Sequence, residues 1–106
     1  MVTIKLTLPV QVAVIEADGL VATEDKIAFG RLEECATEYR RSCAEQGIGS
    51  PGGVEGVQVA RSFFRAIGID PTKTRPSSEA LLRRALKEKP LHAVNTLVDL
   101  CNWCSL

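Results

Sequence analysis

The fold is decided by residues 70–84, which read DPTKTRPSSEALLRR. The Asp70-Pro71 pair stops a helix that arrives from the N-terminal side, because the residue before a proline is driven out of the α region. Pro76 and Ser77 then favour the start of a new helix, since both residue types suit its first positions. This stretch therefore predicts a sharp connection between two short helices.

Working outward toward the N-terminus, an amphipathic helix is predicted from Thr23 to about Gln46. Thr23 is a suitable N-cap, and the residues after it place apolar side chains at helical spacing with acidic side chains on the other face. Glycine, serine and proline dominate residues 47–53, a composition typical of a loop. This loop would separate the first helix from a second.

Three further helices are predicted. The second runs from about Val54 and ends at Gly68, a residue type suited to the left-handed end of a Schellman motif. The third begins at Ser77, and Pro90 separates it from a fourth helix over residues 91–105. The second half of the chain is thus expected to be helical throughout.

Strands are predicted at the N-terminus. Residues 3–7 alternate with a period of two, and residues 10–15 form a second β-rich run before the Asp18-Gly19 turn. Strands followed by helices predict an α+β fold in a single domain over residues 1–106. Two strands cannot cover four amphipathic helices, so we expect more sheet from missing sequence or from another chain.

The composition excludes several classes of protein. The chain has 106 residues, of which 45% are hydrophobic and 25% charged, as in ordinary globular domains. No stretch approaches the roughly 20 apolar residues of a membrane span, and the first fifteen residues lack a secretory signal pattern. Nothing beside the four cysteines indicates an oxidising compartment. We therefore expect a cytoplasmic protein with reduced thiols.

Positive charge is concentrated in one segment. The chain carries 13 basic and 13 acidic side chains, but residues 73–89 have a net charge of +4. Cations in this segment can contact the phosphates of a nucleic acid. The candidates are Lys73, Arg75, Arg83 and Arg84. An ordinary solvated helix face is the alternative, because no aromatic residues are interleaved for base stacking.

The predicted fourth helix carries a polar stripe. His92, Asn95, Asp99 and Asn102 are three or four residues apart and fall on one helical face. Asparagine is a poor helix former, and a solvent face would more economically use Lys, Glu or Gln. The composition favours a face turned toward a ligand, a loop or a partner. A simple solvated face is the alternative.

Cys101 and Cys104 form a C-x-x-C pair in the same helix. A redox pair or half of a zinc site would use this spacing. The other candidate ligands are His92, Cys35 and Cys43, which are poorly spaced, and Cys101 lies inside the predicted helix rather than at its start. We therefore predict core cysteines and no metal or cofactor. The chain contains no complete catalytic set.

Residues 70–84, together with Asp99 and Asn102, resemble the B3/B4 domain found in the β subunit of phenylalanyl-tRNA synthetase and in freestanding B3/B4 proteins. Residues 59–69 also fit the freestanding proteins. The resemblance implies an α+β fold. The family's pocket histidine would lie past Leu106, so we expect this chain to be the N-terminal portion of a B3/B4-type domain.

The resemblance implies recognition of aminoacyl-tRNA or an amino acid, with editing hydrolysis of mischarged tRNA in the complete protein. Together with the polar stripe it assigns the substrate-binding residues Asn95, Asp99, Cys101 and Asn102, where Cys101 replaces a threonine of the family's editing pocket. Whether this chain is an enzyme stays open. The alternative is a non-catalytic small-ligand or protein-interaction module with the same fold. A homo-oligomer, or a second chain that completes the domain, is expected.

Overall fold

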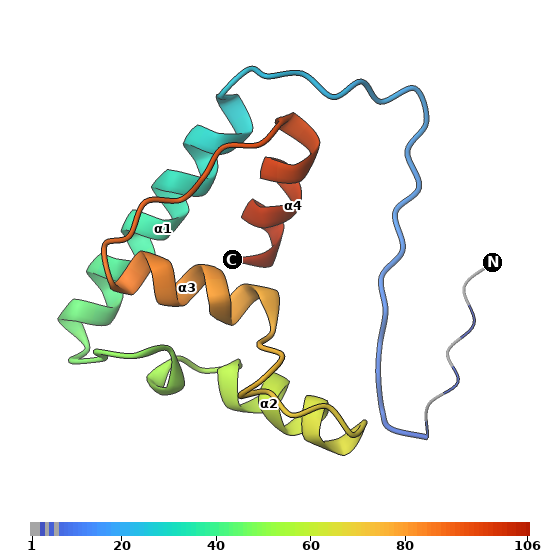
Figure 1. Ribbon diagram of the computed structural model, residues 1–106, viewed down its shortest axis with the longest axis vertical. Coiled ribbons are helices and arrows are strands. Elements are labelled where there is room, and N and C mark those ends of the chain that lie inside the picture. The colour runs from blue at the N-terminus through green and yellow to red at the C-terminus, as the bar shows by residue number, and fades with distance from the viewer. Residues whose placement is uncertain (1–2, 4, 6) are drawn as a thin grey trace.

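The computed structural model describes residues 3, 5 and 7–106, and in that part all regular elements are helical (Figure 1). The α-helices are α1 (Ile27–Glu45), α2 (Val57–Ala66), α3 (Ser77–Leu86) and α4 (Thr96–Ser105), and a 3-10 turn η1 (Pro51–Gly53) precedes α2. Helix α1 packs against both α3 and α4, whereas α2 lies beyond α3 (Figure 1). None of these helices is long and apolar enough to cross a membrane.

The predicted α+β fold is wrong for the part of the chain that the structure describes. Residues 10–15 are extended, but they form no backbone hydrogen bonds with another described segment. Residues 3, 5 and 7 are not in a strand, and residues 4 and 6 of that predicted strand lie outside the described residues. A strand needs a neighbour that completes its hydrogen-bond ladder. Residues 8–22 instead form an extended segment, called the arm below (Figure 1).

The root of the arm is attached to the beginning of α4. The Thr23 carbonyl accepts hydrogen bonds from the Thr96 backbone N–H at 2.8 Å and from the Thr96 hydroxyl at 2.9 Å. The prediction of Thr23 as an N-cap is therefore wrong. Helix α1 begins later, at Ile27, whose N–H donates to Asp25 Oδ1 at 3.1 Å.

The core is centred on one face of α1. Ala28, Leu32, Ala36 and Cys43 are buried, and Leu32 is only 1% exposed. The first three are four residues apart, so they form a stripe along the helix. This stripe is covered by α3 and α4, which both pack on α1.

Helices α1, α2 and α3 all end in a Schellman motif. In α2 the Ile69 N–H donates to the Phe64 carbonyl at 2.8 Å and Gly68 has a positive φ of 83°, which confirms the predicted ending. Helix α1 ends in the same way at Gly47. At the equivalent position after α3, Glu88 has a φ of 53°. The left-handed conformation is strained for a residue with a side chain.

We expect Glu88→Gly to raise the free energy of unfolding by about 1 kcal/mol, because glycine removes this strain. The ion pair lost with the Glu88 side chain, to Arg40 at 3.9 Å, is exposed and contributes little. Equilibrium denaturation measures the change. Lys87→Gly is the matched control, and it should lower stability because Lys87 has a negative φ of −90°. A gain in both variants, or in neither, would contradict the assignment of strain to Glu88.

An ion pair with little exposure connects α2 to α3. Arg61 donates from Nε and Nη2 to the two oxygens of Glu79 at 2.9 and 2.7 Å, and the Glu79 side chain is 6% exposed. Arg75 Nε lies 3.6 Å from the same carboxylate. The hydrogen bond from Arg61 and the charges of Arg61, Arg75 and Arg83 hold the pKa of Glu79 below its usual range, although burial acts in the opposite direction. The pair therefore stays ionised in the folded protein.

We expect Glu79→Ala to lower the free energy of unfolding at neutral pH by more than the loss of an exposed ion pair does, because it leaves the partly buried Arg61 without its partner. The folded-state pKa of Glu79 lies below its ordinary value of 4.5. The stabilisation is therefore complete above that value and is lost as the pH falls through the folded-state pKa. Denaturation curves at several acidic pH values should show a steeper loss in the original protein than in the variant.

Arg41→Ala is the control for this experiment. Among the described residues Arg41 pairs with Glu38 and Glu45 on the exposed surface of α1, and exposed pairs of this kind contribute little to stability. Equal losses of stability in the Glu79 and Arg41 variants would refute the distinction between the two ion pairs.

Candidate functional site

A cavity of about 170 Å³ lies where the root of the arm meets the beginning of α4. It is lined by the residues before α1 and by those around the start of α4: Glu24, Asp25, Lys26, Ala93, Val94, Asn95 and Asp99. Two of the predicted substrate-binding residues, Asn95 and Asp99, are thus brought to one cavity. Three carboxylates and one lysine give the lining an excess of acidic groups.

Asp99 is the most buried residue of this lining, with 1% of its surface exposed. Its Oδ1 accepts the Val94 backbone N–H at 2.9 Å. Among the described residues no group donates a hydrogen bond to Asp99 Oδ2. One oxygen of a held carboxylate is therefore available to a donor in the cavity.

Asn95 is the N-cap of α4. Its side-chain oxygen accepts the Val98 N–H at 3.0 Å, which satisfies one of the free donors in the first turn. The predicted helix over residues 91–105 is therefore too long, because α4 begins only at Thr96. His92 lies outside the helix, so the predicted four-residue stripe is not formed. Asp99 and Asn102 are the two members inside α4.

Asp25 contributes a second carboxylate, and hydroxyl groups surround it. The Thr23 hydroxyl donates to Asp25 Oδ2 and the Ile27 N–H donates to Oδ1. The Thr96 hydroxyl lies 3.2 Å from Oδ2 and shares its one proton between this oxygen and the Thr23 carbonyl. The Thr23 hydroxyl most strongly, and then the Ile27 N–H, hold the pKa of Asp25 below its usual range. Asp25 is therefore ionised at neutral pH and makes this side of the cavity negative.

We expect Thr23→Val to raise the pKa of Asp25 toward its ordinary value of 3.8, because the largest stabilising hydrogen bond to the carboxylate is removed. Thr96→Val should raise it less, since its hydrogen bond contributes least. Carboxyl-carbon NMR titration of both variants measures the two shifts. An unchanged pKa in Thr23→Val, or the reverse order of the shifts, would contradict this account.

The other two predicted substrate-binding residues do not line the cavity. Cys101 is exposed and lies two positions after Asp99 in the helix, so the two side chains leave α4 in different directions. Asn102 is half-buried and lies about one turn beyond Asp99. The structure thus divides the predicted set into a cavity pair and an outlying pair.

The prediction of core cysteines in α4 is wrong. Cys101 and Cys104 are both exposed, because the face of α4 that carries Asp99 is the buried one. Cys43 on α1 is the buried cysteine, and burial raises the pKa of the half-buried Cys35 thiol. In the part of the chain that is described, no group of His, Cys, Asp and Glu side chains is arranged to hold a metal ion.

The four predicted nucleic-acid-binding residues fall into two groups. Lys73 and Arg83 are exposed. Arg75 lies against Glu79, and Arg84 donates to the Pro90 carbonyl from Nη2 at 2.7 Å and from Nε at 3.1 Å. Arg75 and Arg84 therefore have structural contacts, whereas Lys73 and Arg83 can reach a polyanion without breaking any contact described here.

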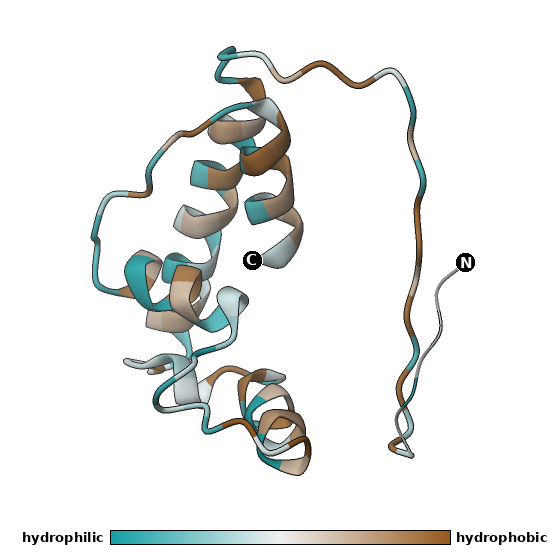
Figure 2. Cartoon of the chain, turned by 45° about the vertical axis from the view of Figure 1, so that its right-hand side comes forward, coloured by the Kyte–Doolittle hydropathy of each residue, from teal (hydrophilic) through white to brown (hydrophobic). Residues whose placement is uncertain are grey.

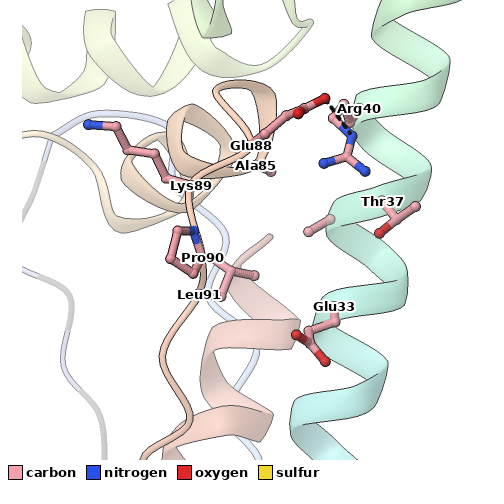
Figure 3. Close-up of a pocket in the computed structure, with 9 residues that line it drawn as sticks. Glu33, Thr37, Arg40, Ala85, Glu88, Lys89, Pro90 and Leu91 are labelled. Atoms are coloured by element: carbon pink, nitrogen blue, oxygen red, sulfur yellow. Dashed lines mark ion pairs between the residues drawn. The ribbon is translucent and has the colours of Figure 1, made fainter.

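A second cavity, of about 180 Å³, lies between α1 and the connection from α3 to α4 (Figure 3). Glu33, Thr37 and Arg40 line it from α1, and Glu88 faces Arg40 from the other side (Figure 3). Sequence reasoning missed this cavity, because no local pattern relates these positions on α1 to the end of α3. It contains none of the predicted binding residues, so the cavity at α4 is the stronger candidate.

Comparison with known proteins adds no residue to either cavity. No protein-family model, curated protein or solved structure matches this chain. The resemblance to the B3/B4 domain therefore rests on the residues of the sequence itself.

Proposed function

We propose that this chain recognises aminoacyl-tRNA or an amino acid as a B3/B4-like module. The observation that carries the proposal is the cavity at α4, where Asp99 presents a carboxylate oxygen beside Asn95 and the ionised Asp25. An α-ammonium group is a cation with N–H donors, so it matches a lining rich in carboxylates. The volume of about 170 Å³ suits a group of a few heavy atoms.

The residues that line this cavity can bind and orient a ligand, but they include no serine, threonine or cysteine. Cys101, which stands at the position of the family's threonine, is exposed and does not line the cavity. Editing hydrolysis of mischarged tRNA is therefore proposed only for a complete protein that brings further groups to this place. The chain itself would act in recognition.

The nucleic-acid part of a ligand would be held by phosphate contacts. Lys73 and Arg83 are exposed, and so are Lys87 and Lys89 at the end of α3. Each such contact releases counterions, so the affinity should fall as salt is raised. Binding through Asp99 would by contrast depend on the amino group of the ligand.

Isothermal titration of the chain with tyrosyl-tRNA or phenylalanyl-tRNA tests the proposal. We expect binding that weakens with salt, and a loss of about tenfold or more in Asp99→Asn, because a hydrogen bond to a charged acceptor contributes about 1.5–3 kcal/mol. Cys101→Ser is the control and should bind as the original protein does. Equal affinity for charged and uncharged tRNA, or no effect of Asp99→Asn, would exclude the cavity as the site.

A non-catalytic module that binds a small ligand or a protein is the second candidate. The exposed apolar side chains favour it, among them Ile15 at 91% and Trp103 at 39%. Titration with free tyrosine and phenylalanine separates the two candidates. Binding of the free amino acid without tRNA, again weakened by Asp99→Asn, would favour the small-ligand function.

A further inference from the structure

The chain exposes more surface than a compact protein of its size. Its accessible surface is 7871 Å², whereas a folded monomer of 11.5 kDa has about 5,800 Å². Its radius of gyration is 15.6 Å, against about 13 Å expected for a domain of this length. The surplus of about 2,000 Å² is larger than the roughly 800 Å² that one partner contributes to a stable interface.

The arm carries a large share of the exposed apolar side chains. Five of them are at least 53% exposed: Val12, Val14, Ile15, Leu20 and Val21. The arm stands away from the helices over most of its length, with apolar segments along it (Figure 2). Covering this apolar surface with another surface would be favourable in water.

The helices present exposed apolar surface as well. Leu100 and Trp103 of α4 are 42% and 39% exposed. Near the beginning of the arm, an open apolar hollow of about 510 Å³ separates residues 9–11 from Val59 and Phe63 of α2. Within one chain, the arm therefore borders an open space and leaves the exposed apolar side chains of α2 and α4 uncovered.

The distribution of charge favours one kind of partner for the arm and for the exposed helix faces. The arm, residues 8–22, contains two carboxylates, Glu16 and Asp18, and no lysine or arginine, whereas residues 73–89 have a net charge of +4. Two arms paired with each other would bring like charges together. An arm placed on the basic segment of another copy would bring opposite charges together, which favours association and sets its orientation.

We propose that two copies of this chain exchange arms, so that the arm of each copy lies across α3 and α4 of the other. The valines of the arm cover Leu100 and Trp103, and its carboxylates Glu16 and Asp18 lie near the cations of the basic segment. Hydrogen bonds between Thr23 and Thr96 hold the root of the arm on its own copy. The exchange is reciprocal, so it closes as a two-fold dimer.

Sedimentation equilibrium of the chain over a range of protein concentrations tests the proposal. We expect a dimer whose dissociation constant rises about 100-fold or more in the double variant Val12→Asp, Val14→Asp, since two buried apolar side chains are replaced by charges. Gln11→Asp, Ala13→Asp is the matched control, because it adds the same two charges to the opposite side of the extended arm. It should change the dissociation constant less than about threefold, well below tenfold.

Mixing two defective variants distinguishes arm exchange from other dimers. One double variant, Val12→Asp, Val14→Asp, has a damaged arm and intact helices. The other, Leu100→Asp, Trp103→Asp, has an intact arm and a damaged α4. Each alone should be monomeric, whereas their mixture retains one intact arm on one intact α4 and should form heterodimers. The helical circular dichroism of the arm variant should be unchanged, because the arm lies outside the helices.

A monomer at all concentrations overturns the proposal. So does a dimer that Val12→Asp, Val14→Asp leaves intact, or a dimer that the mixture of variants fails to restore. If arm exchange is excluded, the proposed binding function of the cavity at α4 still stands, because neither variant alters the residues that line this cavity.

Discussion

Small side chains on one face of α1 allow two other helices to pack against it. Ala28 and Ala36 each place only a methyl group on this face, and Leu32 between them fills the space at the centre. The positions of α3 and α4 both depend on this stripe. Through α3 the ion pair of Glu79 then places α2, and through α4 the backbone of Thr96 places the root of the arm.

The candidate site is a consequence of how α4 begins. Asn95 caps the helix, and Asp99 reaches back to the Val94 N–H, so both side chains are held by backbone hydrogen bonds. Only one oxygen of Asp99 is used in this way among the described contacts. Groups that are fixed by a helix start are well suited to position a ligand, because binding need not order them.

Part of this site could be predicted from the sequence. The choice of Asn95 and Asp99 as unusual residues was possible because asparagine and aspartate are poor helix formers, but the capping role of Asn95 shows that local structure already explains part of the pattern. Asp25 was not predicted, since it lies 70 residues or more from its neighbours Asn95 and Thr96 in the chain. The exposure of Cys101 was not predicted either, because helical spacing does not tell which face of α4 meets α1.

The sequence by itself determined the features that depend on neighbouring residues. Pro76 and Ser77 start α3, and Gly68 ends α2, because these residues set the backbone conformation at their own positions. Only the tertiary structure decided that residues 10–15 stay an arm, because a strand exists only when a distant segment supplies its hydrogen bonds. It likewise decided that Thr23 holds α4 rather than caps α1, since that choice depends on a contact across the fold.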